Sequence, residues 1–172
     1  MRYLSVVVLI VALLSCKTKE HINKKKTNEV TVNWCPDNGR CSFEVFSNKE
    51  LLIKYDEFNE LYSSIVDGKN IVLKIEYVRN EMPNTVDGGL REQVFLEVNP
   101  KTIKEEAKDS KSIKIIYARW CYCKGQAGYF RPSNKEVYFK KVNNERYELN
   151  LDFKMKEIPQ SISHIVQVFN LP

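Results

Sequence analysis

The feature that most constrains the fold is an apolar side chain at every second position over much of the chain after residue 29. Successive side chains of a strand point to opposite faces, so this spacing gathers the apolar ones on one face. The clearest runs are Val30/Val32/Trp34, Leu51/Ile53/Tyr55, Ile71/Leu73/Ile75/Tyr77, Val94/Leu96/Val98 and Tyr147/Leu149/Leu151/Phe153. Further strands are expected over 41–47, 112–123 and 136–142, with a hairpin turn at 143–145. The chain is therefore expected to be mainly β, as an antiparallel sandwich or an open barrel.

Three segments depart from this alternation and favour short helices. One has apolar residues at helical spacing between Asp56, a good N-cap, and Gly68, a good residue beyond a helix end: Phe58, Leu61, Tyr62 and Ile65. A second repeats the spacing after Pro159, at Ile162, Ile165, Val166 and Phe169. Residues 100–108 are a candidate for a short polar turn. We expect one or two of these segments to cover a sheet, with an α+β fold as the alternative.

Four cysteines lie beyond the N-terminal region. Cys35 and Cys41 surround Pro-Asp-Asn-Gly-Arg, and Cys121 and Cys123 lie in Trp-Cys-Tyr-Cys. In an oxidising compartment an even number predicts disulfides, with three possible connectivities. Alternate residues of a strand lie about 6.6–6.8 Å apart at Cα, the far limit for a bridge. We therefore expect at least one bridge between the 35–41 turn and the 121–123 strand.

Two other roles for these cysteines stay open. If Cys35 pairs with Cys41, then Cys121 and Cys123 remain as a redox dithiol or as a strained, reducible bridge. Four thiolates are also a possible zinc site, although typical zinc knuckles separate their cysteines by roughly two to four residues. Here the gaps are five residues and one residue. Structural disulfides without a metal are the expected outcome.

The small number of histidines limits catalysis. Only His21 and His164 are present, and His164 lies between apolar neighbours of the expected C-terminal helix, as a structural histidine would. The chain has no Gly-x-Ser-x-Gly, phosphate-binding loop or His-Glu-x-x-His motif. A glycosidase carboxylate pair stays open, because its acids need not be close in sequence. We expect no catalytic activity and no cofactor.

Two loops, residues 79–91 and 124–134, are candidates for a binding face. They carry Met82, Tyr129, Phe130 and Arg131 among glycines and prolines. Exposed aromatic and arginine side chains on well-supported loops are enriched in interfaces. In the alternative interpretation, Tyr129 and Phe130 begin another strand and pack inward.

The first residues indicate where the protein is located. Arg2 precedes an apolar run over residues 4–14 that ends in Leu13-Leu14-Ser15-Cys16. Eleven residues are too few to cross about 30 Å of hydrocarbon as a helix. The segment resembles the signal peptide and lipobox of bacterial lipoproteins. That resemblance implies cleavage before Cys16 and attachment of lipid there, with acyl chains such as palmitate. Two or more chains give stable anchoring.

The residues after Cys16 refine this expectation. They are Lys17-Thr18-Lys19-Glu20, without the aspartate that retains bacterial lipoproteins in the inner membrane or the acidic cluster that marks surface export in Bacteroidota. The resemblance therefore implies the periplasmic leaflet of the outer membrane, with surface exposure as the alternative. The Lys- and Asn-rich body is similar in composition to small Bacteroidota lipoproteins, a similarity that brings no activity with it.

The positive charge is confined to the segment after Cys16. Residues 17–28 contain five lysines and one glutamate, a net charge of +4, and almost no apolar residues. This composition is typical of a flexible tether. From residue 29 onward, 21 basic residues balance 21 acidic ones. Both the neutral body and the envelope location argue against nucleic acid as a partner.

These observations favour one globular domain over residues 29–172, held to the membrane by its lipid. We expect it to act as a binding or structural module of the cell envelope, with an envelope protein as its partner. Two other classes stay open. One is an inhibitor or immunity-type binder of an envelope hydrolase or toxin, and the other is a thiol-redox or metal-handling protein that uses Cys121 and Cys123.

Overall fold

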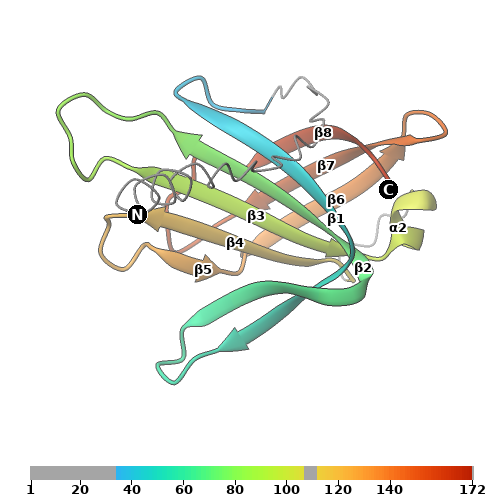
Figure 1. Ribbon diagram of the computed structural model, residues 1–172, viewed down its shortest axis with the longest axis horizontal. Helices are drawn as coiled ribbons and strands as arrows, with labels where there is room; N and C mark the ends of the chain where they lie inside the picture. Colours follow the sequence, from blue (N-terminus) through green and yellow to red (C-terminus); the bar gives the residue numbers. More distant parts are fainter. Residues whose placement is uncertain (1–33, 107–111, 172) are drawn as a thin grey trace, which may run out of the picture.

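Two antiparallel sheets face each other in the computed structural model, which describes residues 34–106 and 112–171 (Figure 1). Sheet A has the order β1-β2-β3-β4-β5, and sheet B has the order β6-β7-β8. The strands of sheet A are β1 (Gly39–Tyr55), β2 (Leu61–Arg79), β3 (Leu90–Val98), β4 (Lys114–Cys121) and β5 (Gly128–Phe130). Those of sheet B are β6 (Asn134–Lys141), β7 (Arg146–Lys154) and β8 (His164–Asn170). The expected mainly β fold is confirmed as a sandwich without barrel closure.

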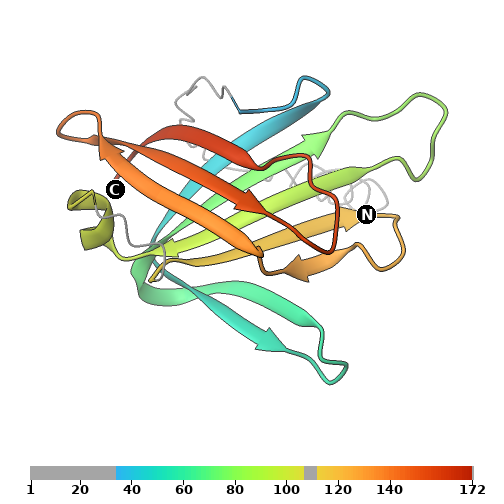
Figure 2. The same ribbon diagram turned by 180° about the vertical axis from the view of Figure 1, so that it is seen from behind.

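The main core lies between the two sheets, which overlap when the molecule is seen from behind (Figure 2). Its residues are those that the alternation pattern assigned to one face. Leu73 of β2, Leu96 of β3 and Leu149 of β7 are fully buried. Each such side chain contributes roughly 1.5–3 kcal/mol when it is removed from water. Burial of these apolar side chains therefore holds the two sheets together.

One short helix, α2 (Pro100–Lys104), follows β3 in the described part of the chain. The Asn99 side chain accepts a hydrogen bond from the Lys101 N–H, and Pro100 occupies the first turn, where its missing N–H has no cost. Ile103 of this helix is fully buried in the main core. The expected polar turn is thus confirmed as a helix over its first five residues.

The helix predicted between Asp56 and Gly68 is wrong, because this segment is a β-hairpin. Tyr55 at the end of β1 pairs with Leu61 at the start of β2. Phe58 lies in the turn, and Leu61, Tyr62 and Ile65 lie on both faces of β2, so their spacing matched that of a helix by coincidence. Gly68 is required for a different reason: a Cβ atom there would come within 2.2 Å of the Glu50 side chain.

The C-terminal helix is also wrong, because residues 164–170 form β8 and pair with β7. Ile165, Gln167 and Phe169 all point into the core, and the polar Gln167 had hidden their alternation. Gln167 is 1% exposed, and its side chain accepts a hydrogen bond from the Trp34 indole N–H at 3.2 Å. It donates to the Val168 carbonyl at 2.8 Å. These bonds offset the cost of burying an amide.

Glu92 joins the loop between β7 and β8 to sheet A. This fully buried carboxylate on the inner face of β3 accepts the Ser161 N–H at 2.8 and 2.9 Å, the Ser161 hydroxyl at 2.9 Å and the Ile162 N–H at 3.2 Å. Burial raises the pKa of the neighbouring Tyr117 hydroxyl, and the Glu92 charge raises it further. Glu92 therefore fixes the loop that leads into β8.

Candidate functional site

The most distinctive surface is a two-stranded hairpin that leaves sheet A. We call residues 48–68 the arm. Strand β3 pairs with β2 only from Ile71 onward, so the preceding part of β2 and the end of β1 pair with each other alone. A register shift at Ser47/Lys49, with Asn48 at a positive φ of 55°, marks a bulge where the arm begins. The arm then projects from the sandwich (Figures 1 and 2).

A buried carboxylate fixes the base of the arm. Glu97, 4% exposed at the end of β3, accepts the Leu51 N–H at 2.7 Å, the Asn70 amide at 2.7 Å and the Lys114 ammonium at 2.9 Å. Burial alone would raise the pKa of Glu97, but the bonds from Lys114, Leu51 and Asn70 outweigh it and hold the pKa below its usual range. The charged form of Glu97 therefore connects β1, β2 and β4 at one point.

A second, smaller core lies behind this ion pair, on the outer face of sheet A. Its buried members are Leu51, Val72, Phe95 and Ala118. Ile53 and Ile65 of the arm pack against it, so the face of the arm that carries them lies on the sheet. An isolated two-stranded hairpin is marginally stable at best. This cluster and Glu97 therefore supply the support that holds the arm in position.

The distal half of the arm exposes large apolar side chains. The exposed fractions are 37% for Leu52, 55% for Tyr55, 77% for Phe58 and 40% for Tyr62. These are four of the nine exposed large apolar side chains among the described residues. Tyr62 pairs with Lys54 in the register, so it lies on the opposite face from Tyr55, and Phe58 lies in the turn between the strands. Apolar surface is thus exposed on both faces and at the tip.

The tip of the arm is held by its own hydrogen bonds. One oxygen of the Asp56 carboxylate accepts the Phe58 N–H at 2.9 Å and the Glu60 N–H at 2.8 Å. The Asp56 N–H donates to the Glu60 carbonyl, and Asn59 adopts a positive φ of 62°, which asparagine tolerates better than most residues. Phe58 is therefore presented by a defined turn.

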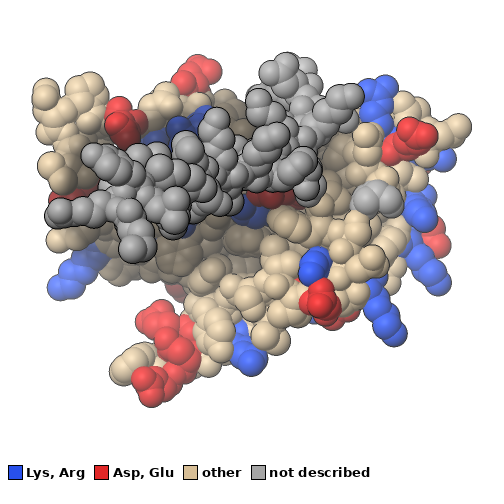
Figure 3. All heavy atoms as spheres, in the orientation of Figure 1, with Lys and Arg blue, Asp and Glu red and all other residues tan. Residues whose placement is uncertain are grey.

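Acidic residues flank Phe58 in sequence, and acidic side chains gather at the end of the arm (Figure 3). The Asp56 carboxylate accepts the hydrogen bonds of the turn, whereas Glu57 and Glu60 form no ion pair with any described residue. Lys54 is the single basic residue between positions 52 and 62. The tip is therefore both apolar and negatively charged.

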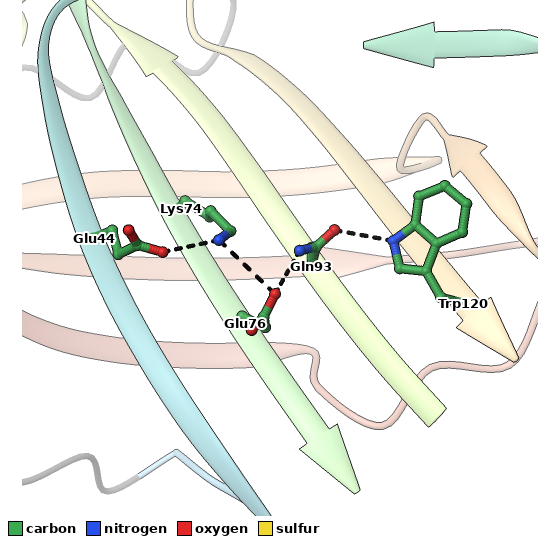
Figure 4. A network of polar contacts seen from close by, with 5 residues as sticks. All are labelled: Glu44, Lys74, Glu76, Gln93 and Trp120. Atoms are coloured by element: carbon green, nitrogen blue, oxygen red, sulfur yellow. Dashed lines mark hydrogen bonds and ion pairs between the residues drawn. The ribbon is translucent and has the colours of Figure 1, made fainter. Parts of the chain in front are cut away.

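A polar ladder crosses the rest of the outer face of sheet A (Figure 4). Lys74 contacts Glu44 at 2.8 Å and Glu76 at 3.8 Å, the Gln93 amide donates to Glu76, and the Trp120 indole N–H donates to Gln93 at 2.9 Å. These side chains satisfy one another, as cross-strand pairs on an open face do. The ladder orients Trp120 and contributes to the support of the sheet.

The cysteines form two local pairs, and the predicted bridge between the two segments is wrong. Cys35 pairs with Cys41 across a turn, with Cα atoms 5.7 Å apart, and Cys121 pairs with Cys123 at a Cα distance of 5.3 Å. Strand β4 ends at Cys121, where the chain bends, so the extended spacing of a strand does not apply. The described residues contain no group of three side chains suited to a metal ion.

The other predicted binding residues do not form one surface. Tyr129 and Phe130 form β5 and are half-buried, as the alternative interpretation proposed. Tyr129 contacts the Trp120 ring edge-to-face at a centroid distance of 5.3 Å, and Phe130 packs on the main core. Met82 and Arg131 are exposed in loops.

His164 is not the helical core-edge residue that the sequence predicted. It is exposed on β8, and its Nδ1 atom lies 2.8 Å from an Asp152 oxygen. Asp152 also lines an open depression of about 510 Å³, together with Glu136 and Lys154. The expected signal peptide and tether, with Cys16 and His21, lie outside the described residues, as do Val30 and Val32.

The arm is the part of the site that sequence reasoning missed. An indication was present: the apolar alternation at 51/53/55 is followed by Asp56 and Asn59, residues that favour turns, and then by apolar residues at 61 and 65 on either side of Ser63. No protein-family model, curated protein or solved structure matches the chain. Within residues 34–106 and 112–171, no helix has the length and apolar character needed to cross a membrane.

Proposed function

We propose that this protein is a lipid-anchored bacterial envelope domain that acts by binding a protein partner through the arm, without catalysis. The observation that carries the proposal is the exposure of Tyr55, Phe58 and Tyr62 on a hairpin held firmly at its base. Contiguous exposed apolar surface marks interaction sites. Tyrosine and phenylalanine are among the residues enriched in interfaces.

The rigid support of the arm also favours a role in binding. The contacts of Glu97 at the base and of Asp56 at the tip order the arm before any partner arrives. A preorganised element loses less conformational entropy on binding than a flexible loop does. An inhibitor or immunity-type binder of an envelope hydrolase or toxin is a narrower form of the same proposal.

Site-specific photo-crosslinking tests the proposed function. A crosslinking amino acid replaces Phe58 in the full-length lipidated protein, within the envelope of its own bacterium. Replacement of Tyr138, which is 42% exposed on sheet B, is the matched control. A discrete protein adduct at position 58 that is missing at position 138 supports binding through the arm. No adduct at position 58, or the same adducts at both positions, contradicts it.

The anchoring part of the proposal depends on Cys16. The lipobox resemblance and the basic residues after Cys16 support a lipid anchor in the outer membrane. Cys16→Ser is expected to block lipidation and leave a full-length precursor, because the modified thiol is what processing requires. Mass spectrometry of the membrane fraction measures this, and normal processing and anchoring of the variant would refute the anchor.

A second candidate function, thiol-disulfide exchange, rests on Cys121 and Cys123. Their pair closes a loop of only three residues at the end of β4, both cysteines are half-buried, and Tyr122 between them is 86% exposed. Bridges that solvent can reach are in general easier to reduce than fully buried ones. Titration with a dithiol reductant tests it: selective reduction of this pair before Cys35–Cys41 supports exchange, and simultaneous reduction of both argues against it.

A further inference from the structure

Resting on the proposed function, we infer that the arm inserts tip-first into a cleft of its partner. This cleft has apolar walls and, at the end that receives the tip, lysine or arginine side chains. Apolar side chains on both faces of the arm and acidic side chains at its tip point to this partner.

The distribution of apolar surface points to insertion. Tyr55 and Tyr62 lie on opposite faces of the two-stranded hairpin, and Phe58 lies at its end. A flat partner surface laid against one face would leave the other tyrosine in water. Only a partner that surrounds the arm removes all three side chains from solvent, and fully enclosed aromatic residues are the ones that dominate binding energies.

The charges at the tip define the deep end of the cleft. Glu57 and Glu60 flank Phe58 in sequence, and neither makes an ion pair with a described residue. Acidic groups beside an inserted aromatic side chain would be desolvated at a cost unless cations meet them. The complementary surface is therefore basic.

The same charges argue against a lipid surface as the occupant. Anionic headgroups attract lysine and arginine and repel carboxylates. A loop tip that enters such a membrane would carry basic residues beside its aromatic ones, whereas this tip carries Asp56, Glu57 and Glu60. A folded protein with a cleft that is basic at its deep end fits these residues better.

The experiment extends the crosslinking at position 58 to positions 55 and 62, one on each face of the arm. It is repeated at position 58 in a Glu57→Lys/Glu60→Lys background and in a Glu57→Gln/Glu60→Gln background, which removes the charge while nearly keeping the shape. Lys54→Glu is the control for a charge change of the opposite sense. All variants alter exposed side chains, and their unfolding midpoints are measured to verify folding.

Insertion into a basic cleft predicts that positions 55, 58 and 62 all crosslink to one protein, at a peptide containing apolar residues and lysine or arginine. The charge reversal is expected to lower the adduct yield about tenfold, with the glutamine variant between it and wild type and Lys54→Glu at or above wild type.

Different crosslinking results contradict the basic contacts, the insertion, the kind of partner and the proposed function. An adduct at position 58 whose yield is unchanged or raised by the charge reversal overturns the basic deep end of the cleft but leaves the proposed function standing. Crosslinking from only one of positions 55 and 62 overturns insertion. Adducts to a second copy of this chain, to residues 17–28 of the same chain or to lipid overturn the inferred partner. Loss of any adduct specific to position 58 contradicts the proposed function itself.

Discussion

The sandwich and the arm are built from the same kinds of residues but use them in different ways. Leu149 and Leu151 of the sandwich are completely buried, whereas Tyr55 and Phe58 of the arm are more than half exposed. Burial of apolar area stabilises a fold by roughly 25 cal/mol per Å². The exposed side chains of the arm therefore contribute little to folding, and their role is to be sought in binding.

The largest expected contrast is between a core residue and a tip residue. Leu149→Ala is expected to lower the free energy of unfolding by about 2–5 kcal/mol, because it leaves a cavity among fully buried neighbours. Phe58→Ala is expected to change it by less than about 0.5 kcal/mol. Urea denaturation of both variants measures the difference. A large loss of stability in Phe58→Ala would show that the tip packs on the body of the protein and would remove the basis for a binding role.

Two buried glutamates of β3 sharpen the contrast between sandwich and arm. Glu92 on the inner face holds the β7–β8 loop, and Glu97 on the outer face holds the arm. Glu92→Ala leaves buried N–H groups without acceptors in the main core and is expected to lower the global stability by about 3 kcal/mol. Glu97→Ala is expected to cost about 1 kcal/mol globally, since most of its effect is local to the arm.

Hydrogen exchange separates these two effects. In Glu97→Ala, the amides of residues 49–55 and 61–67 are expected to lose protection while those of β7 keep it. In Glu92→Ala, protection is expected to fall throughout both sheets. Uniform loss of protection in both variants would mean that the arm and the sandwich unfold as one unit.

The sequence predicted the sandwich well because core strands leave a clear alternation, as in Ile71, Leu73 and Ile75. It failed at β8, where one of the core residues is the amide Gln167. It also failed at residues 56–68, where apolar residues in a turn and on both faces of β2 matched a helical spacing. The cysteine pairing failed because the exact end of β4 is set by tertiary structure. The arm was not predictable as a site, because an apolar residue gives the same alternation pattern in the sequence whether its side chain faces the core or the solvent.

Disulfides test whether the sandwich is stabilised independently of the arm, because neither pair lies in the arm. Cys35–Cys41 closes seven residues and Cys121–Cys123 closes three, so loop entropy predicts stabilisation of about 2.4 and about 1.6 kcal/mol respectively. Cys35→Ser/Cys41→Ser is therefore expected to lower the unfolding midpoint more than Cys121→Ser/Cys123→Ser, and neither is expected to change crosslinking at position 58. Non-reducing proteolysis with mass spectrometry verifies the pairing, and a peptide linking the 35–41 turn to residues 121–123 would contradict it.

The smallest expected effect is a pH-dependent release at the base of the arm. Burial raises the pKa of Glu97, but the bonds from Lys114, Leu51 and Asn70 outweigh burial and lower this pKa. These bonds are therefore fully formed above the pKa of an ordinary glutamate and are lost as the pH falls through the lowered pKa. The NMR signal of the Leu51 amide is expected to stay constant from pH 7 to pH 5 and to shift with a midpoint below the pKa of a glutamate in an unfolded peptide. Glu97→Gln, which has no such proton to take up, is expected to remove that transition. A midpoint above the pKa of a glutamate in an unfolded peptide would mean that burial outweighs these bonds, and the arm would then be less firmly held at neutral pH than its contacts indicate.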